Sequence, residues 1–125
     1  MNEQLSNALA FGHTIDITTT GRRTGLARRI EIVFHRIDGR LIVSGSPRVA
    51  KRAWLRNLEA DPRLTLHLKG AVAADLPGTA RIITDEADRR AIADWLVAHA
   101  WPTMDATALA RYSPMIEITL EELAA

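Results

Sequence analysis

The sequence predicts a single α+β domain in which about six short antiparallel strands form a small, closed or partly closed barrel with two or three helices. Alternation of apolar and polar residues, which is typical of half-buried strands, recurs in short segments. Turns of hairpin length connect most of these segments. No series of strand–helix–strand units occurs, which excludes a doubly wound parallel sheet. Closure into a barrel removes the exposed edges that such a sheet would have.

The first half of the chain is expected to hold three strands and one helix. The strands cover residues 13–20, 28–36 and 40–44, and the helix covers residues 49–60. The first two strands are β-branched and alternating, and a glycine turn separates them. Asp38-Gly39 is a strong hairpin signal before the third strand. Gly45-Ser46-Pro47 breaks the sheet, and Asp61-Pro62 ends the helix because proline disfavours helical geometry in the residue before it.

The second half is expected to hold three more strands and two helices. The strands cover residues 63–69, 71–83 and 115–120, and the helices cover residues 84–99 and 106–112. Pro77-Gly78 is expected to introduce a bulge or bend into the long strand. Thr84 is placed to cap the longer helix, which Trp101-Pro102 stops. Side chains of this helix expected to face the core are Ala91, Ile92, Trp95, Leu96 and His99.

The composition is that of one globular domain over residues 1–125. Of these residues 47% are hydrophobic, and the formal net charge is +1. The absence of cysteine excludes disulfides, thiolate chemistry and Cys-ligated metals. No apolar run approaches the roughly 20 residues that span a bilayer, and no signal-peptide pattern opens the chain. We therefore expect a cytoplasmic protein without an integral membrane segment.

Charge is divided unevenly along this nearly neutral chain. Residues 1–56 hold ten Lys and Arg against four Asp and Glu, whereas residues 57–125 hold six against eleven. Such asymmetry is typical of a surface that meets an anion. The densest basic stretch comprises Arg22, Arg23, Arg28 and Arg29. Planar guanidinium groups suit phosphate or carboxylate, and a solvated surface is the alternative interpretation.

A second candidate site follows the third expected strand. Ser44-Gly45-Ser46-Pro47 is a small-residue turn toward a helix that carries Lys51 and Arg52. A helix N-terminus offers free N–H groups to an anion, although the spacing is not that of a Walker loop. A plain strand-to-helix connection is the alternative. Trp54 and Asn57 share the apolar face of the helix, where we expect Trp54 to pack and Asn57 to hydrogen-bond nearby backbone.

Other catalytic patterns are missing from the sequence. The four histidines, which lack metal-ligand spacing, are His13, His35, His67 and His99. We therefore expect no metal site. No nucleophile-elbow serine and no evident acid/base carboxylate pair occurs. Tyr112 is either a proton donor or a packed residue. The basic stretch lacks interleaved aromatic residues, so nucleic acid is not an expected partner.

Two motifs stand in a specific order. The first is Thr18-Thr-Thr-Gly-Arg-Arg-Thr-Gly25 with Arg28 after it, and the second runs from Ala53-Trp54 through Asn57-Leu58 to Asp61-Pro62, with Ser44 between them. Together they resemble the deazaflavin-dependent nitroreductase and quinone reductase family of actinobacteria. The resemblance is strong over residues 15–68 and looser beyond. It implies a homodimeric split β-barrel, like that of flavin-binding pyridoxamine-phosphate-oxidase proteins.

The resemblance also implies a cofactor and roles for residues. Family members bind reduced coenzyme F-420, which carries a phosphate and a polyglutamate tail, and pass a hydride to quinone, nitro or other electrophiles; FMN is the alternative cofactor. It implies that Arg28 contacts the coenzyme and that Ser44 lies near the deazaflavin ring and the substrate. Lys51 and Arg52 would grip the phosphate tail. The remaining candidates for coenzyme binding are Ser46, Trp54 and Asn57.

The chain departs from the family pattern at several positions. Ala27 and Arg52 replace prolines, Glu31 adds a charge to the second strand, and Met104 and Thr107 stand where members carry tyrosines that line the substrate pocket. From the resemblance we expect a reductase that acts on a small apolar acceptor, with Ser44 orienting that acceptor or hydrogen-bonding its developing negative charge. The missing tyrosines favour the alternative, a non-catalytic carrier of flavin, deazaflavin, haem or a fatty acyl ligand.

Overall fold

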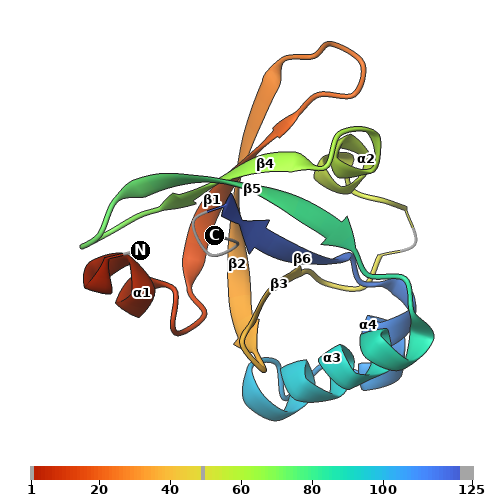
Figure 1. Cartoon of the computed structure of the whole chain (residues 1–125). Coiled ribbons are helices and arrows are strands. Elements are labelled where there is room, and N and C mark those ends of the chain that lie inside the picture. Colours follow the sequence, from red (N-terminus) through yellow and green to blue (C-terminus); the bar gives the residue numbers. More distant parts are fainter. Residues whose placement is uncertain (1, 49, 122–125) are drawn as a thin grey trace.

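The computed structural model describes residues 2–48 and 50–121, and over these residues it forms a closed six-stranded barrel with four helices (Figure 1). In chain order the elements are α1 (Glu3–Ala8), β1 (Thr14–Thr20), β2 (Ala27–Ile37), β3 (Arg40–Ser44), α2 (Ala53–Ala60), β4 (Arg63–Leu68), β5 (Ala74–Ile82), α3 (Glu86–His99), α4 (Ala106–Tyr112) and β6 (Met115–Leu120). Around the barrel the strands follow the order β1-β2-β3-β6-β5-β4, and all neighbours are antiparallel. The predicted fold class is confirmed.

Turn chemistry fixes the first three strands. Asp38 and Gly39 have φ angles of 50° and 79° and close a two-residue turn, with Ile37 paired to Arg40. The predicted hairpin is therefore confirmed. Between β1 and β2, the N–H of Gly25 donates to the carbonyl of Gly21 at 2.8 Å, and Gly25 has a φ of 71° that favours glycine.

Strand β5 passes Pro77 and Gly78 without a bulge. The register between β4 and β5 runs one to one from Arg63 opposite Thr79 to Leu68 opposite Ala74. The predicted bulge is therefore wrong. Gly78 instead allows β6 to lie close to β5, because a Cβ at position 78 would be 2.7 Å from the carbonyl oxygen of Thr119.

The helices differ from the predictions mainly at their N-terminal ends. Helix α2 begins at Ala53, residues 50–52 are not helical, and the predicted start at Val49 lies outside the described residues. Helix α3 is capped by Asp85 rather than Thr84, since the Asp85 carboxylate accepts from the N–H of Asp88 at 2.8 Å. Helix α1 was not predicted; it is only six residues long and has no fully buried residue, although Leu5 and Ala8 pack against the barrel core.

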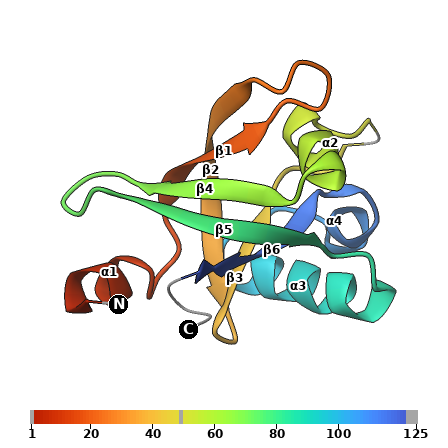
Figure 2. The same cartoon turned by 45° about the horizontal axis from the view of Figure 1, so that its top comes forward.

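Two hydrophobic cores flank the barrel wall. The barrel interior holds Ile15, Ile17, Phe34, Leu66 and Ile116, together with side chains of α2. A second core lies between the wall and the helices α3 and α4, which Figures 1 and 2 show side by side against the barrel. The buried residues of α3 are Ile92, Ala93 and Leu96. The expectation that Ala91 and His99 face the core is wrong, since both are exposed.

None of the described helices is both long enough and apolar enough to cross a membrane.

Candidate functional site

Three adjoining depressions surround α2 and contain most of the predicted site residues. We call them the turn cavity, of about 490 Å³, the flank cavity, of about 610 Å³, and the main cavity, of about 350 Å³. Arg22 lines both the turn and flank cavities, and Lys51 lines both the flank and main cavities. A long ligand can therefore follow one path around the helix.

The turn cavity lies between the β1–β2 turn and α2, and Asn57 holds the two together. Its Oδ1 accepts from the backbone N–H of Arg22 at 3.1 Å, and its Nδ2 donates to Thr19 Oγ1 at 3.1 Å. The expected backbone hydrogen bond of Asn57 is confirmed. Trp54 is buried in the barrel core, as expected, while it also lines this cavity. Arg28, Trp54 and Asn57 are thus brought together.

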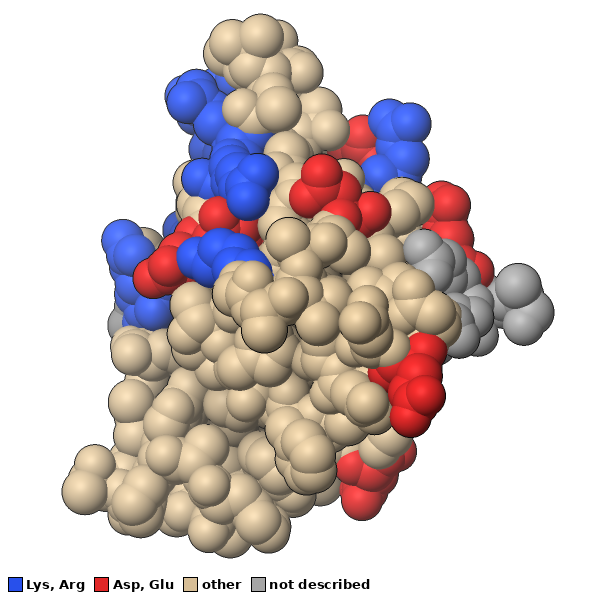
Figure 3. Space-filling model, turned by 90° about the vertical axis from the view of Figure 1, so that its left-hand side faces the viewer, with Lys and Arg blue, Asp and Glu red and all other residues tan. Residues whose placement is uncertain are grey.

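The cations of the turn cavity differ in whether they are neutralised. Within the described chain, Arg22, Arg23 and Arg28 form no ion pair with a carboxylate, whereas Arg29 Nε pairs with Asp16 Oδ2 at 2.9 Å. Figure 3 shows basic side chains over the β1–β2 ribbon with acidic side chains beside them. The unpaired guanidiniums are available to an incoming anion.

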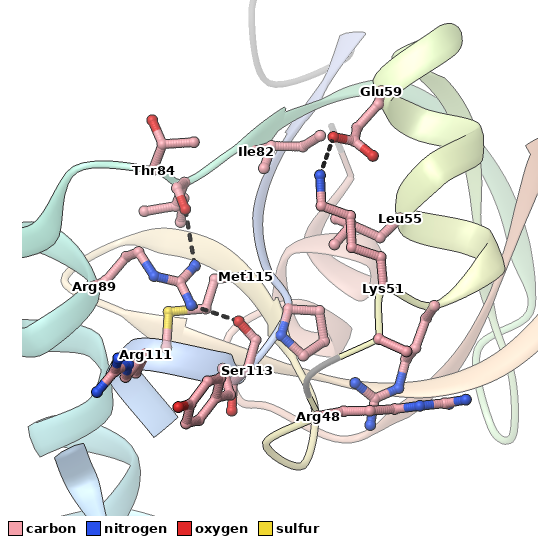
Figure 4. Close-up of a pocket in the computed structure, with 15 residues that line it drawn as sticks. Arg48, Lys51, Leu55, Glu59, Ile82, Thr84, Arg89, Arg111, Ser113 and Met115 are labelled. Carbon is pink, nitrogen blue, oxygen red and sulfur yellow. Dashed lines mark hydrogen bonds and ion pairs between the residues drawn. The ribbon is translucent and has the colours of Figure 1, made fainter. Parts of the chain in front are cut away.

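The main cavity lies where α2, the end of β5, α4 and the start of β6 meet (Figure 4). Its apolar floor consists of Leu55, Ile82, Ile83, Pro114 and Met115. Its cationic rim consists of Arg48, Lys51, Arg52 and Arg111. Arg89 has a structural role, because its guanidinium donates to the carbonyls of Ala110, Ile83 and Ser113 at 2.8, 2.9 and 2.6 Å.

The positive charge of the rim is only partly neutralised by ion pairs. Burial, and then repulsion by Arg48, hold the pKa of the Arg52 guanidinium below its usual range. Arg52 Nη2 donates to the carbonyl of Ser46 at 3.1 Å and meets no carboxylate in the described part of the chain. Lys51 differs, since its Nζ pairs with Glu59 Oε2 at 2.7 Å (Figure 4). An anion between Arg48 and Arg52 would relieve their repulsion.

Helix α2 adds backbone donors beside this rim. Its N-cap residue, Arg52, is extended and makes no side-chain capping hydrogen bond. The first N–H groups of a helix have no intrahelical acceptor, so those of α2 can serve an anion together with the two arginines. The sequence placed Lys51 and Arg52 in the first helical turns. The structure instead places them just before the helix, where they still line the main cavity.

Two buried serines lie at or beside the main cavity. Ser44 is 4% exposed and does not line the cavity, but it pairs in register with Met115, which does. Ser113 lines the cavity. The Oγ atoms of both serines have no hydrogen-bond partner among the described residues. Ser113 and Arg48 were missed from the sequence, because only the tertiary structure brings them to the same cavity. Ser46 contributes its backbone carbonyl rather than its hydroxyl.

The replaced tyrosine positions lie outside this cavity. Met104 packs against the core beneath α3 and α4. Thr107 Oγ1 accepts from Arg90 Nη1 at 3.0 Å. Neither residue lines the main cavity, whereas Tyr112 does.

The barrel with its cationic path around α2 defines a split-barrel protein that is suited to a polyanionic ligand. The model of the F420H(2)-dependent quinone reductase family matches residues 2–117. The chain belongs to this family of deazaflavin-dependent oxidoreductases.

Solved structures share the fold at low sequence identity. A conserved hypothetical protein from Mycobacterium tuberculosis is 18% identical with a TM-score of 0.74, over 97% of this chain and 81% of that one. A putative pyridoxamine 5'-phosphate oxidase from Listeria innocua is 13% identical with a TM-score of 0.67, over 95% and 92% of the two chains. An F420-H2 dependent reductase is 20% identical with a TM-score of 0.58, over 85% and 93%. The split-barrel prediction is confirmed.

Proposed function

We propose that this protein binds reduced coenzyme F-420 around α2 and passes a hydride from it to a small apolar acceptor of the quinone, nitro or enone type. The observation that carries the proposal is the path of cations beside an apolar floor, several of which, such as Arg22, Arg28 and Arg52, pair with no carboxylate among the described residues. Membership of the family supports the same cofactor.

The residues present fit the charges of this coenzyme. Its phosphate and polyglutamate carboxylates would lie along Arg22, Arg28, Arg48 and Arg52, which have no other anion to neutralise them within the described chain. FMN has a single phosphate and no polyglutamate tail, so it would leave part of this path without a partner. The charge pattern and the family match therefore favour the deazaflavin over FMN.

The protein's part in the reaction is to bind, orient and exclude water. When bound, the reduced deazaflavin supplies the hydride. The floor formed by Leu55, Ile82 and Met115 would hold an apolar acceptor away from water. The Ser44 hydroxyl is buried and has no partner within the described chain, and we propose that it donates a hydrogen bond to negative charge that develops on the acceptor. Tyr112 lines the same cavity and is the candidate proton donor.

The test is a titration followed by a single turnover. The protein is titrated anaerobically with coenzyme F-420, FMN and haem, and binding is followed by absorbance. The complex with reduced coenzyme is then mixed with menadione, and reoxidation is recorded against coenzyme without protein. We expect binding of the deazaflavin and a protein-dependent reoxidation. Binding without reoxidation across several quinone and nitro acceptors would instead establish a carrier.

We also propose that the protein is a homodimer. Phe11 is 80% exposed, and it lines a depression of about 480 Å³ together with Val33, Trp95 and Trp101. Figure 3 shows that the side of the molecule with α1 has a wide area without charged side chains. Exposed apolar surface of this kind is typical of interfaces. Light scattering should give twice the chain mass, and Phe11→Glu should give the monomer; a wild-type monomer at working concentrations would refute the dimer.

A further inference from the structure

A hydroxyl, an imidazole and a carboxylate form a hydrogen-bonded row on the outer face of the barrel. Thr18 Oγ1 is 2.6 Å from His67 Nε2, and His67 Nδ1 is 2.7 Å from Asp75 Oδ1. None of the three residues lines a cavity around α2. The function proposed above does not use them.

The strand register brings the three side chains together. His67 in β4 is the direct partner of Asp75 in β5, and Thr18 in β1 is the direct partner of Thr65, two residues before His67. Since side chains alternate along a strand, Ile17 and Leu66 fill the barrel while Thr18 and His67 face outward. Three strands thus hold the group, and His67 is only 7% exposed.

The hydrogen bonds define donor and acceptor roles for the neutral form of His67. The hydrogen bond from His67 lowers the pKa of the Asp75 carboxyl, so this group is an anion at neutral pH and only accepts. In the neutral imidazole, Nδ1 therefore carries the proton. Nε2 then has the free lone pair and accepts the hydrogen bond of the Thr18 hydroxyl. This order of nucleophile, base and orienting carboxylate is the one that activates hydroxyl nucleophiles in acyl transfer.

Thr18 also borders space for a substrate. It lines a cavity of about 380 Å³ together with Thr65, Arg63 and Pro77. That volume admits a short acyl group. The hydroxyl of Thr65 is a donor of the kind that stabilises an oxyanion. The guanidinium of Arg63 is bound by Asp61 at 3.0 and 2.8 Å, and Glu121 also lines the cavity. A nucleophile, a base and an adjoining polar cavity are therefore present at one place.

We propose that Thr18, His67 and Asp75 form a second active site, which hydrolyses small activated esters without the deazaflavin. Thr18 Oγ1 bonds to the ester carbonyl carbon while its proton passes to His67 Nε2. The bond to the leaving alcohol then breaks, and the alcohol departs with that proton. A water molecule next bonds to the acyl carbon and gives its proton to His67. The bond between Thr18 and the acyl group breaks, the threonine oxygen regains the proton, and the carboxylic acid leaves.

The experiment uses p-nitrophenyl acetate and the full chain without coenzyme. We expect hydrolysis above that in buffer, and Thr18→Val and His67→Gln should each lower it about a hundredfold. Thr18→Ser should retain it, because serine keeps the hydroxyl. The matched control is Thr14→Val, which removes an outward hydroxyl from the same strand at a position outside the cavity. Mass spectrometry of the acid-quenched reaction should find the acetyl group on Thr18.

Two results would overturn the second active site. One is equal hydrolysis by the wild type and Thr18→Val, which differ only in the hydroxyl and keep the same side-chain shape. The other is acetylation at residues other than Thr18. Thermal unfolding of every variant identifies a loss of folding, and the nearly isosteric Thr18→Val keeps the test decisive if His67→Gln does not fold. Menadione reduction by the same samples is measured separately, so the absence of one activity can be distinguished from the absence of the other.

Discussion

The side chain of Asn57 in α2 donates to the hydroxyl of Thr19 in β1 at 3.1 Å, and both residues are buried. The same amide accepts the N–H of Arg22 at 3.1 Å. One side chain thus sets the position of the basic turn against the helix. The geometry of the turn cavity depends on this link.

Replacing Asn57 with alanine should destabilise the fold and weaken coenzyme binding together. The buried Thr19 hydroxyl and the Arg22 N–H lose their partner, so the free energy of unfolding should fall by about 1–3 kcal/mol. Urea denaturation measures this change, and absorbance titration measures the affinity. The control is Asn7→Ala on the exposed surface of α1. An unchanged urea midpoint for Asn57→Ala would show that the link is dispensable.

Arg28 and Arg29 form a matched pair for testing the path of the coenzyme. They are neighbours in β2 with the same charge, but only Arg29 has a carboxylate partner in the described structure. Arg28→Ala should therefore weaken coenzyme binding about tenfold at low salt, and less as salt screens the contact. Arg29→Ala should have a smaller effect. Equal affinities for wild type and Arg28→Ala at low salt would exclude contact between Arg28 and the anionic coenzyme.

The same reasoning separates Lys51 from Arg52 at the main cavity. Lys51 is already paired with Glu59, whereas Arg52 is not paired with a carboxylate within the described residues. Arg52→Ala should weaken binding more than Lys51→Ala, as measured in the same salt series. The reverse order would mean that the Lys51–Glu59 pair opens to receive the coenzyme.

An acid-sensitive ion network joins β3, α3 and β6. Arg40 donates two hydrogen bonds to Asp88, at 2.9 and 2.8 Å, and also contacts Glu117. The hydrogen bonds from Arg40 lower the pKa of Asp88 below its usual 3.8. Burial alone would raise the pKa of Glu117, but hydrogen bonds from Arg40 and Arg81 bring it below 4.5. Both carboxylates are therefore more acidic in the folded state than in the unfolded state.

This network should make stability fall in acid. A lowered folded-state pKa contributes stability above the unfolded-state value, and that contribution is lost as the pH falls through the folded-state pKa. Urea denaturation of the wild type should show a loss beginning near pH 4.5 and growing below it. Arg40→Gln should lower stability at pH 7 by about 1–3 kcal/mol and flatten the acid loss. The control Arg90→Gln removes an exposed pair and should cost less than about 1 kcal/mol. An acid profile that is the same in Arg40→Gln would refute the assignment.

Local patterns predicted the strands and hairpin, because alternation and turn residues act over a few positions. Asp38-Gly39 fixes its turn alone. The start of α2 could not be read in this way, since it depends on where the chain must place Trp54 and Leu58 in the barrel core. The prediction of a bulge at Pro77-Gly78 was wrong, because the glycine is required by the close approach of β5 to β6 and not by a local distortion of the strand.

The site was predictable as a set of residue types but not as a geometry. The basic half of the sequence and the two motifs identified Arg28, Lys51, Arg52 and Asn57, which all lie around α2. Which cations are neutralised depends on partners that only the register supplies; Asp16, for example, reaches Arg29 across the strand pair β1–β2. For the same reason the Thr18–His67–Asp75 group was invisible, because its members come from three strands.

Ser44→Ala should separate stability from turnover. The Ser44 hydroxyl is buried and has no partner among residues 2–48 and 50–121, and a buried unpaired hydroxyl costs free energy. Its removal should therefore raise the free energy of unfolding by about 1 kcal/mol. If this hydroxyl stabilises charge on the acceptor, the turnover number should fall about a hundredfold while coenzyme affinity stays near that of the wild type. Urea denaturation and menadione reduction measure the two effects, with the exposed Ser6→Ala in α1 as the control. A more stable variant with undiminished turnover would show that Ser44 takes no part in the reaction. A less stable variant would show that its hydroxyl has a hydrogen-bond partner in solution.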